Sequence, residues 1–182
     1  MKETLETLAQ IIIIDIFIGY GLYSVVFVAF TSIVKRSEFL NKLDGSANTI
    51  IILSGLLYLI SFVILLYLSL PVMAFGPYWW APWSQPIIWI LVTQLLWIKK
   101  LRHSKMARLI ISFLLIVSFE RYVIMVTSFH RDYIPGGWAS ALTTSEIIIG
   151  LTLKTAIFSA MAMVCLYVTD SIKKLKTKEN EY

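Results

Sequence analysis

Long apolar runs separated by short polar segments make up most of this chain. A helix needs about 20 mainly apolar residues to cross a bilayer, whereas a barrel strand needs about 9–11. The runs therefore predict helices, at about residues 11–34, 48–70 (ending at Pro71), 83–98, 107–129 and 146–169. We expect the short third helix to begin at headgroup level, among tryptophans and prolines. The predicted fold class is all-α, a helical bundle of five transmembrane helices in a single domain over residues 1–182.

The basic residues predict the orientation of these helices. The helix ends on one side of the membrane carry only Lys2 and Arg131. Those on the other side carry twelve basic residues, and residues 170–182 form a basic tail there. The positive-inside rule then places the N-terminus outside and the tail in the cytoplasm. The twelve basic residues at the predicted cytoplasmic ends are Lys35, Arg36, Lys42, Lys99, Lys100, Arg102, Lys105, Arg108, Lys173, Lys174, Lys176 and Lys178.

Composition supports lipid as the main solvent of the chain. It is 58% hydrophobic and 15% charged, against roughly 45–50% and 25% in soluble domains. The net charge of +5 then indicates topology and anionic lipid headgroups, and we expect no nucleic-acid partner. Cys165 is the single cysteine, which excludes an internal disulfide and a cysteine-ligated iron–sulfur cluster. We expect no redox cofactor and no metal in this chain.

Four ionisable residues lie in the interior of the apolar runs, away from the first two residues of each run: Asp15, Glu120, Arg121 and Lys154. A charge at the bilayer centre costs at least roughly 2.5–3.5 kcal/mol, so each should have a partner or face water. Glu120 and Lys154 are candidates for an interhelical pair, and Asp15 could meet Arg131 or Lys154. Two interpretations remain open. The residues form a proton relay or polar lining near a quinone, or they form buried ion pairs that fix helix packing.

Two further sets of residues bear on function and packing. His130, Arg131 and Asp132 follow the fourth apolar run on the predicted outer side. They could hydrogen-bond a quinone headgroup or dock a partner subunit, or they could simply cap the helix. Small residues inside the runs should permit close helix contact, and they include Gly19, Gly21, Ser54, Gly55, Ser112, Ser118, Ser159 and Ala160.

Three stretches resemble the NrfD/PsrC family, the polysulfide-reductase-type membrane subunits, most closely the version in bacterial alternative complex III. They are FGPYWW at residues 75–80, QLLWIKKLR at 94–102 and FERYVIMVTSFHRDYIP at 119–135. Residues 143–146 followed by Gly150 are similar to the start of that family's last helix. The resemblance covers most of this chain but only the C-terminal half of the family fold, which implies a four-helix bundle plus a terminal helix.

The resemblance implies a membrane subunit of a quinone- or quinol-linked respiratory oxidoreductase in the bacterial cytoplasmic membrane. Its role would be mainly structural, with a share in proton conduction or in the surroundings of a quinone. Haem and iron–sulfur clusters would belong to partner subunits, beside other membrane subunits and lipid. The residues that match the family positions are Glu120, Arg121, His130, Arg131 and Asp132. The alternatives are a small independent transporter or channel, and a purely structural assembly subunit.

The predicted orientation can be tested by labelling introduced cysteines with an impermeant thiol reagent in intact cells. A cysteine near Lys176 should be shielded and one near Gly137 should be labelled, because the basic ends face the cytoplasm. The reverse labelling pattern would refute the orientation.

Overall fold

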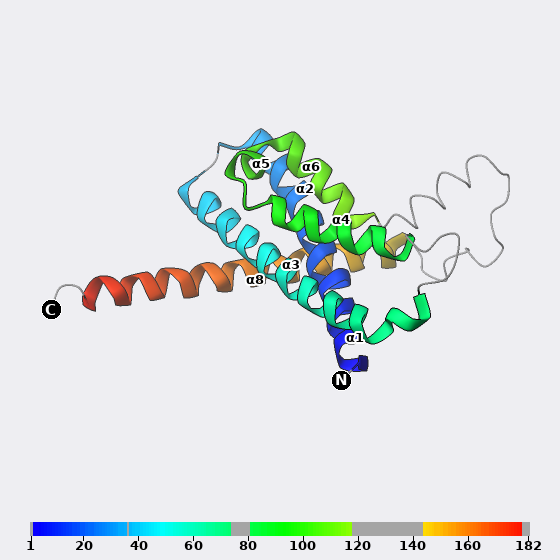
Figure 1. Cartoon of the computed structure of the whole chain (residues 1–182). Coiled ribbons are helices and arrows are strands. Elements are labelled where there is room, and N and C mark those ends of the chain that lie inside the picture. The colour runs from blue at the N-terminus through cyan, green and yellow to red at the C-terminus, as the bar shows by residue number, and fades with distance from the viewer. Residues whose placement is uncertain (1, 36, 74–80, 118–143, 180–182) are drawn as a thin grey trace.

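A computed structural model describes residues 2–35, 37–73, 81–117 and 144–179. Every regular element in these residues is helical (Figure 1), so the all-α fold class is confirmed. The elements are α1 Lys2–Ile11, the π-helix η1 Ile12–Phe17, α2 Ile18–Ile33, α3 Glu38–Met73, α4 Ala81–Leu95, α5 Lys99–His103, α6 Lys105–Ile116 and α8 Thr144–Glu179.

Within the described residues, three helical segments are long and apolar enough to cross a membrane. They are Glu3–Ile33, which joins α1, η1 and α2, then Glu38–Leu68 and Ser145–Leu175. This finding fits a membrane-embedded protein. The 15 residues of α4 and the 12 of α6 extend about 22 and 18 Å at 1.5 Å per residue. Five spans and their orientation therefore stay predictions.

The predicted start of the second helix, at residue 48, was wrong. The helix α3 begins ten residues earlier, at Glu38. Its first turns look polar in sequence, but Leu43, Ala47 and Ile51 are all buried. Apolar residues four positions apart share one helix face, so these turns already pack on the bundle while their polar residues face outward.

The spanning segment ends at Leu68, close to the predicted end, while the helix α3 itself continues past Pro71 to Met73. A proline removes one backbone hydrogen bond. This single loss does not end α3, which keeps helical geometry for two more residues. The last helix, α8, similarly runs through most of the predicted tail, to Glu179.

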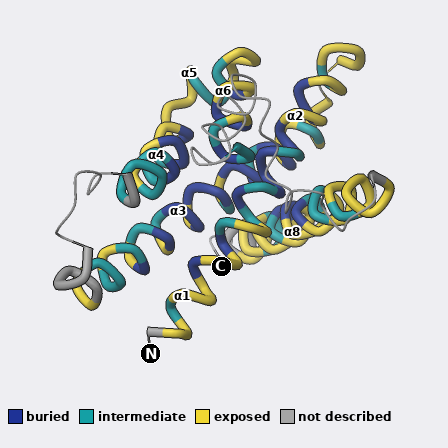
Figure 2. Tube along the Cα trace, turned by 90° about the vertical axis from the view of Figure 1, so that its right-hand side faces the viewer, coloured by how far each residue is buried: buried dark blue, intermediate teal, exposed yellow. Residues whose placement is uncertain are grey.

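In the described residues, four helical segments surround a shared core. The N-terminal helix packs on α3 and α6, and α4 packs on the same two helices. The helix α8 crosses the outside of α2 and α3, and most of its surface is exposed (Figure 2). Aromatic rings fill part of the core, where Phe17 meets Tyr58 and Trp89 edge-on at 5.5 and 6.1 Å between centroids.

Three glycines allow these helices to approach closely, as their sequence positions predicted. Gly19 faces α8, and a Cβ there would lie 3.1 Å from the Cβ of Phe158. Gly21 faces α6 in the same way. Gly55 faces α4, where a Cβ would lie 2.7 Å from the Cβ of Thr93. At Gly21 and Gly55 a Cβ would come within 3 Å of a neighbouring side chain, so a larger residue would require that neighbour to shift, and at Gly19 the contact is tight.

Substituting Gly55→Ala should therefore lower the thermal unfolding temperature of the protein in mild detergent. Overpacking costs about 1–3 kcal/mol, and the higher helix propensity of alanine offsets at most about 1 kcal/mol. Gly45→Ala is the matched control, because a Cβ at Gly45 meets nothing within 4 Å. Equal or higher stability of Gly55→Ala relative to Gly45→Ala would contradict the close contact.

Candidate functional site

A cluster of polar side chains is buried between three helices. Each helix contributes two polar residues that are four positions apart and therefore share one face. All six are buried, and Arg108 is completely inaccessible to solvent. The six residues are Tyr20 and Ser24 on α2, Asp44 and Asn48 on α3, and Arg108 and Ser112 on α6.

An ion pair forms the centre of this cluster. The Nη1 of Arg108 donates to Oδ1 of Asp44 at 2.7 Å, and its Nε donates to Oγ of Ser24 at 3.0 Å. The guanidinium also lies over the ring of Phe27, with Cζ 4.9 Å from the ring centroid. A planar guanidinium can bond several acceptors and stack on an aromatic ring at once. Arg108 therefore connects α6 to both α2 and α3.

Hydrogen bonds extend the cluster along α3. The hydroxyl of Tyr20 donates to Oδ1 of Asn48 at 2.8 Å, and Nδ2 of Asn48 donates to the backbone carbonyl of Asp44 at 2.5 Å. Within the described part of the chain, Nη2 of Arg108 and the hydroxyl of Tyr23 are buried without a hydrogen-bond partner. These two groups, close to the Arg108–Asp44 pair, could therefore each form a further hydrogen bond.

Sequence reasoning missed this cluster. It assigned Arg108 to a basic loop because this residue lies at the very start of the run predicted at 107–129, and it did not select Asp44, which lies just before the run at 48–70. A signal was present in the sequence, since three segments each carry a polar pair at i and i+4. In the structure Arg108 forms an ion pair with Asp44 inside the bundle.

A second ion pair joins the N-terminal helix to α8. The Nζ of Lys154 donates to Oδ1 of Asp15 at 2.7 Å and to the backbone carbonyl of Ile14 at 3.1 Å. Both acceptors lie in the π-helix η1, where Ile18 N bonds the carbonyl of Ile13, five residues back. A π-bulge changes the partners of nearby carbonyls and is frequent at functional sites. Lys154 thus bonds both the side chain and the backbone of this irregular turn.

Close packing brings this pair together. Lys154 and Phe158 are four residues apart on α8, and Gly19 lets that face approach α2. The ring of Phe158 then packs on Tyr20 and Tyr23, at 5.7 and 5.5 Å between centroids. Phe158, one turn after Lys154, therefore connects α8 to Tyr20, which is a member of the buried cluster.

The structure thus places Asp15 beside Lys154, one of the two cations considered for it. The proposed Glu120–Lys154 pair and the quinone-headgroup contacts stay predictions, because their residues lie outside the described ranges. These residues are Glu120, Arg121, His130, Arg131 and Asp132.

Comparisons with known proteins add no assignment. No known protein family, curated protein or solved structure matches the chain. Within residues 2–35, 37–73, 81–117 and 144–179, no three His, Cys, Asp or Glu side chains gather as metal ligands. The functional interpretation therefore depends on the two ion pairs and on the stretches described above.

Substituting Asp44→Asn should strongly destabilise the protein, because it leaves the Arg108 charge buried and uncompensated. Breaking a buried pair in this way costs about 3–5 kcal/mol. Adding Arg108→Met should recover part of the loss, since it removes the orphaned charge. The measurement is the thermal transition of each variant in mild detergent.

Glu38→Gln is the control for this comparison. It removes an ion pair with Lys42 of 3.0 Å whose side chains are largely exposed, so the thermal transition should hardly change. If Asp44→Asn were as stable as Glu38→Gln, the Asp44–Arg108 pair would not hold the helices together.

Proposed function

We propose that this chain is a membrane subunit of a quinone- or quinol-linked respiratory oxidoreductase complex. Its role is mainly structural, with a share in proton conduction or in the surroundings of the quinone. The observation that carries the proposal is the Asp15–Lys154 pair. It lies within two helices that can span a membrane, yet its side chains are 52% and 27% exposed in the chain.

Lipid is an unfavourable neighbour for such a pair. Charged side chains inside a membrane normally face the interior of a bundle or a water-filled cavity, because charge in hydrocarbon costs several kcal/mol. Another membrane subunit packed over η1 and α8 removes this cost. The exposed pair therefore favours a subunit of a larger assembly over an independent monomer.

The buried cluster supports a structural role for the rest of the bundle. Asp44, Ser24 and Arg108 join three helices through hydrogen bonds that fix their relative register. Buried polar contacts of this kind can specify one packing arrangement among several similar apolar ones. A bundle with one fixed arrangement presents a constant surface to its partners.

The resemblance to NrfD/PsrC subunits supplies the class of complex. From this resemblance, the proposed partners are iron–sulfur and cytochrome subunits, which would hold the clusters and the haem. Quinone would bind nearby, and lipid would surround the membrane subunits. The location would be the bacterial cytoplasmic membrane. A small transporter or channel is the competing function, and purification distinguishes the two.

The test is purification of the full chain from its native membrane through an affinity tag, in mild detergent. We expect other membrane subunits to co-purify, together with the optical and electron-paramagnetic signals of haem and iron–sulfur clusters. A homo-oligomer of this chain alone, at normal abundance and without redox signals, would overturn the proposal.

Lys154→Met should reduce the recovered complex more than tenfold, because Asp15 loses its cation at a cost of roughly 2.5–3.5 kcal/mol. Lys99→Gln is the matched control, since Lys99 is exposed and lies outside the spanning segments. Full recovery of the complex with Lys154→Met would show that the pair is not part of an interface.

A further inference from the structure

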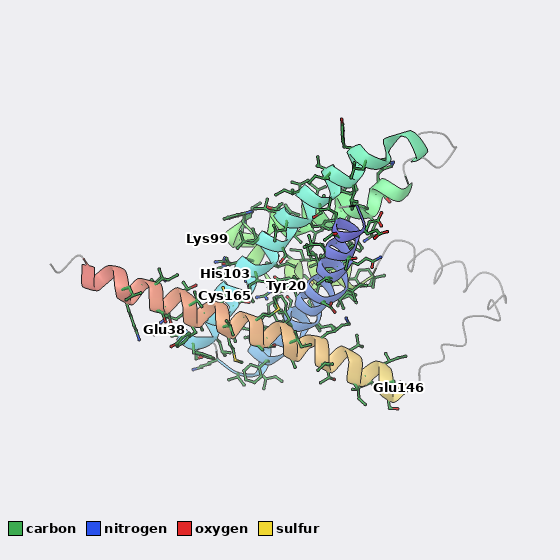
Figure 3. All side chains as sticks on the ribbon, turned by 90° about the horizontal axis from the view of Figure 1, so that it is seen from below. Tyr20, Glu38, Lys99, His103, Glu146 and Cys165 are labelled. Carbon is green, nitrogen blue, oxygen red and sulfur yellow. The ribbon has the colours of Figure 1, made fainter. Side chains whose placement is uncertain are left out.

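A cavity of about 570 Å³ opens between the first turns of α3 and the C-terminal part of α8. Its volume lies within the range of roughly 300–1,000 Å³ that is typical of small-molecule sites. Figure 3 shows Glu38, the first residue of α3, beside this part of α8. The cavity shares no residue with the Asp44–Arg108 pair or with the Asp15–Lys154 pair.

The cavity lies where two apolar helices end. Glu38 begins one spanning segment, and the other segment ends at Leu175, next to Lys174. Such ends lie at the level of lipid headgroups when the helices cross a bilayer. The cavity therefore lies at headgroup level whether these helix ends face the cytoplasm or the outside.

The lining of the cavity combines four charges with an apolar wall. The charges are two ammonium and two carboxylate groups, from Lys42, Lys174, Glu38 and Asp170. The wall consists of apolar and aromatic side chains, among them Phe39, Leu166 and Tyr167. A ligand that fits must therefore carry both signs of charge at one end and hydrocarbon at the other.

We propose that this cavity binds a zwitterionic phospholipid with a primary ammonium, such as phosphatidylethanolamine. The two lysines bind the phosphate, the two carboxylates bind the ammonium, and an acyl chain lies along Leu166 and Tyr167. The Lys42–Glu38 bond of 3.0 Å is an exposed pair, at 51% and 83% exposure of the side chains. Such pairs contribute little stability, so both groups can turn to the ligand at small cost.

The balance of charges selects among lipids. A purely anionic headgroup would leave the two carboxylates facing its charge, which is repulsive. A choline headgroup carries a quaternary ammonium without N–H groups, so it cannot donate hydrogen bonds to the carboxylates. Charge-assisted hydrogen bonds are the strong ones, and only a primary ammonium supplies them here. The proposal does not depend on which complex the chain joins.

The test is native mass spectrometry of the full chain, purified with the partners that stay bound and then delipidated. Dioleoyl phosphatidylethanolamine, phosphatidylcholine and phosphatidylglycerol are titrated separately. We expect phosphatidylethanolamine to bind about tenfold more tightly than phosphatidylcholine, as the loss of a hydrogen bond to a charged group predicts. Equal binding of these two lipids, or a preference for phosphatidylglycerol, would overturn the proposal.

Substitutions of the charged lining residues test whether the preference for phosphatidylethanolamine arises from this cavity. Glu38→Gln with Asp170→Asn should reduce the preference for phosphatidylethanolamine to about twofold or less, because amides do not attract the ammonium. Lys42→Gln with Lys174→Gln should weaken all three lipids. The control, Glu3→Gln with Lys99→Gln, changes the same charge types away from the cavity and should bind like the unsubstituted protein.

A second measurement needs no substitution. Phosphatidylethanolamine with a photoreactive acyl chain, applied to the unsubstituted protein, should crosslink to residues 163–167 of α8. Crosslinks only to other parts of the chain would overturn the proposal, as would protection of residues 163–167 by a bound protein subunit.

Discussion

The bond between Arg108 and Asp44 fixes the geometry on which the rest of this bundle depends. Apolar helices in lipid gain little from burying more hydrocarbon, so directional contacts decide how they pack. Arg108 supplies such contacts to α2 through Ser24 and to α3 through Asp44. Because the guanidinium is fully buried, losing Asp44 would leave its charge without compensation.

Close helix contact and charge placement are coupled in this protein. Gly19 lets α8 approach the N-terminal helix, and the same approach brings Lys154 to Asp15. Gly55 does the same between α3 and α4, where Gln94 then reaches the backbone carbonyl of Ile52 at 3.3 Å. In both places a missing side chain on one helix allows a polar side chain of the other to find its partner.

The surface of the described residues divides into parts suited to different neighbours. Much of α8 is exposed (Figure 2). Its exposed residues include large apolar side chains such as Leu153 and Val164, which suits lipid or another helix. The Asp15–Lys154 pair interrupts that surface inside the spanning segments, and this charge motivates the proposed partner subunit. The cavity between α3 and α8 has both charged and apolar lining residues and lies at the helix ends. For this reason we propose a lipid as its ligand.

The sequence by itself determined the fold class, the three longest apolar helices and the glycines at their contacts. These features follow from hydrophobicity, helix length and side-chain size, which are local properties. It could not place the start of α3, because the polar first turns of that helix are stabilised by packing of Leu43 and Ala47 on the bundle. Only the tertiary structure decided that Arg108 is a buried partner of Asp44 and that Asp15 meets Lys154. These pairs join residues 64 and 139 positions apart, and which charges meet depends on how whole helices pack.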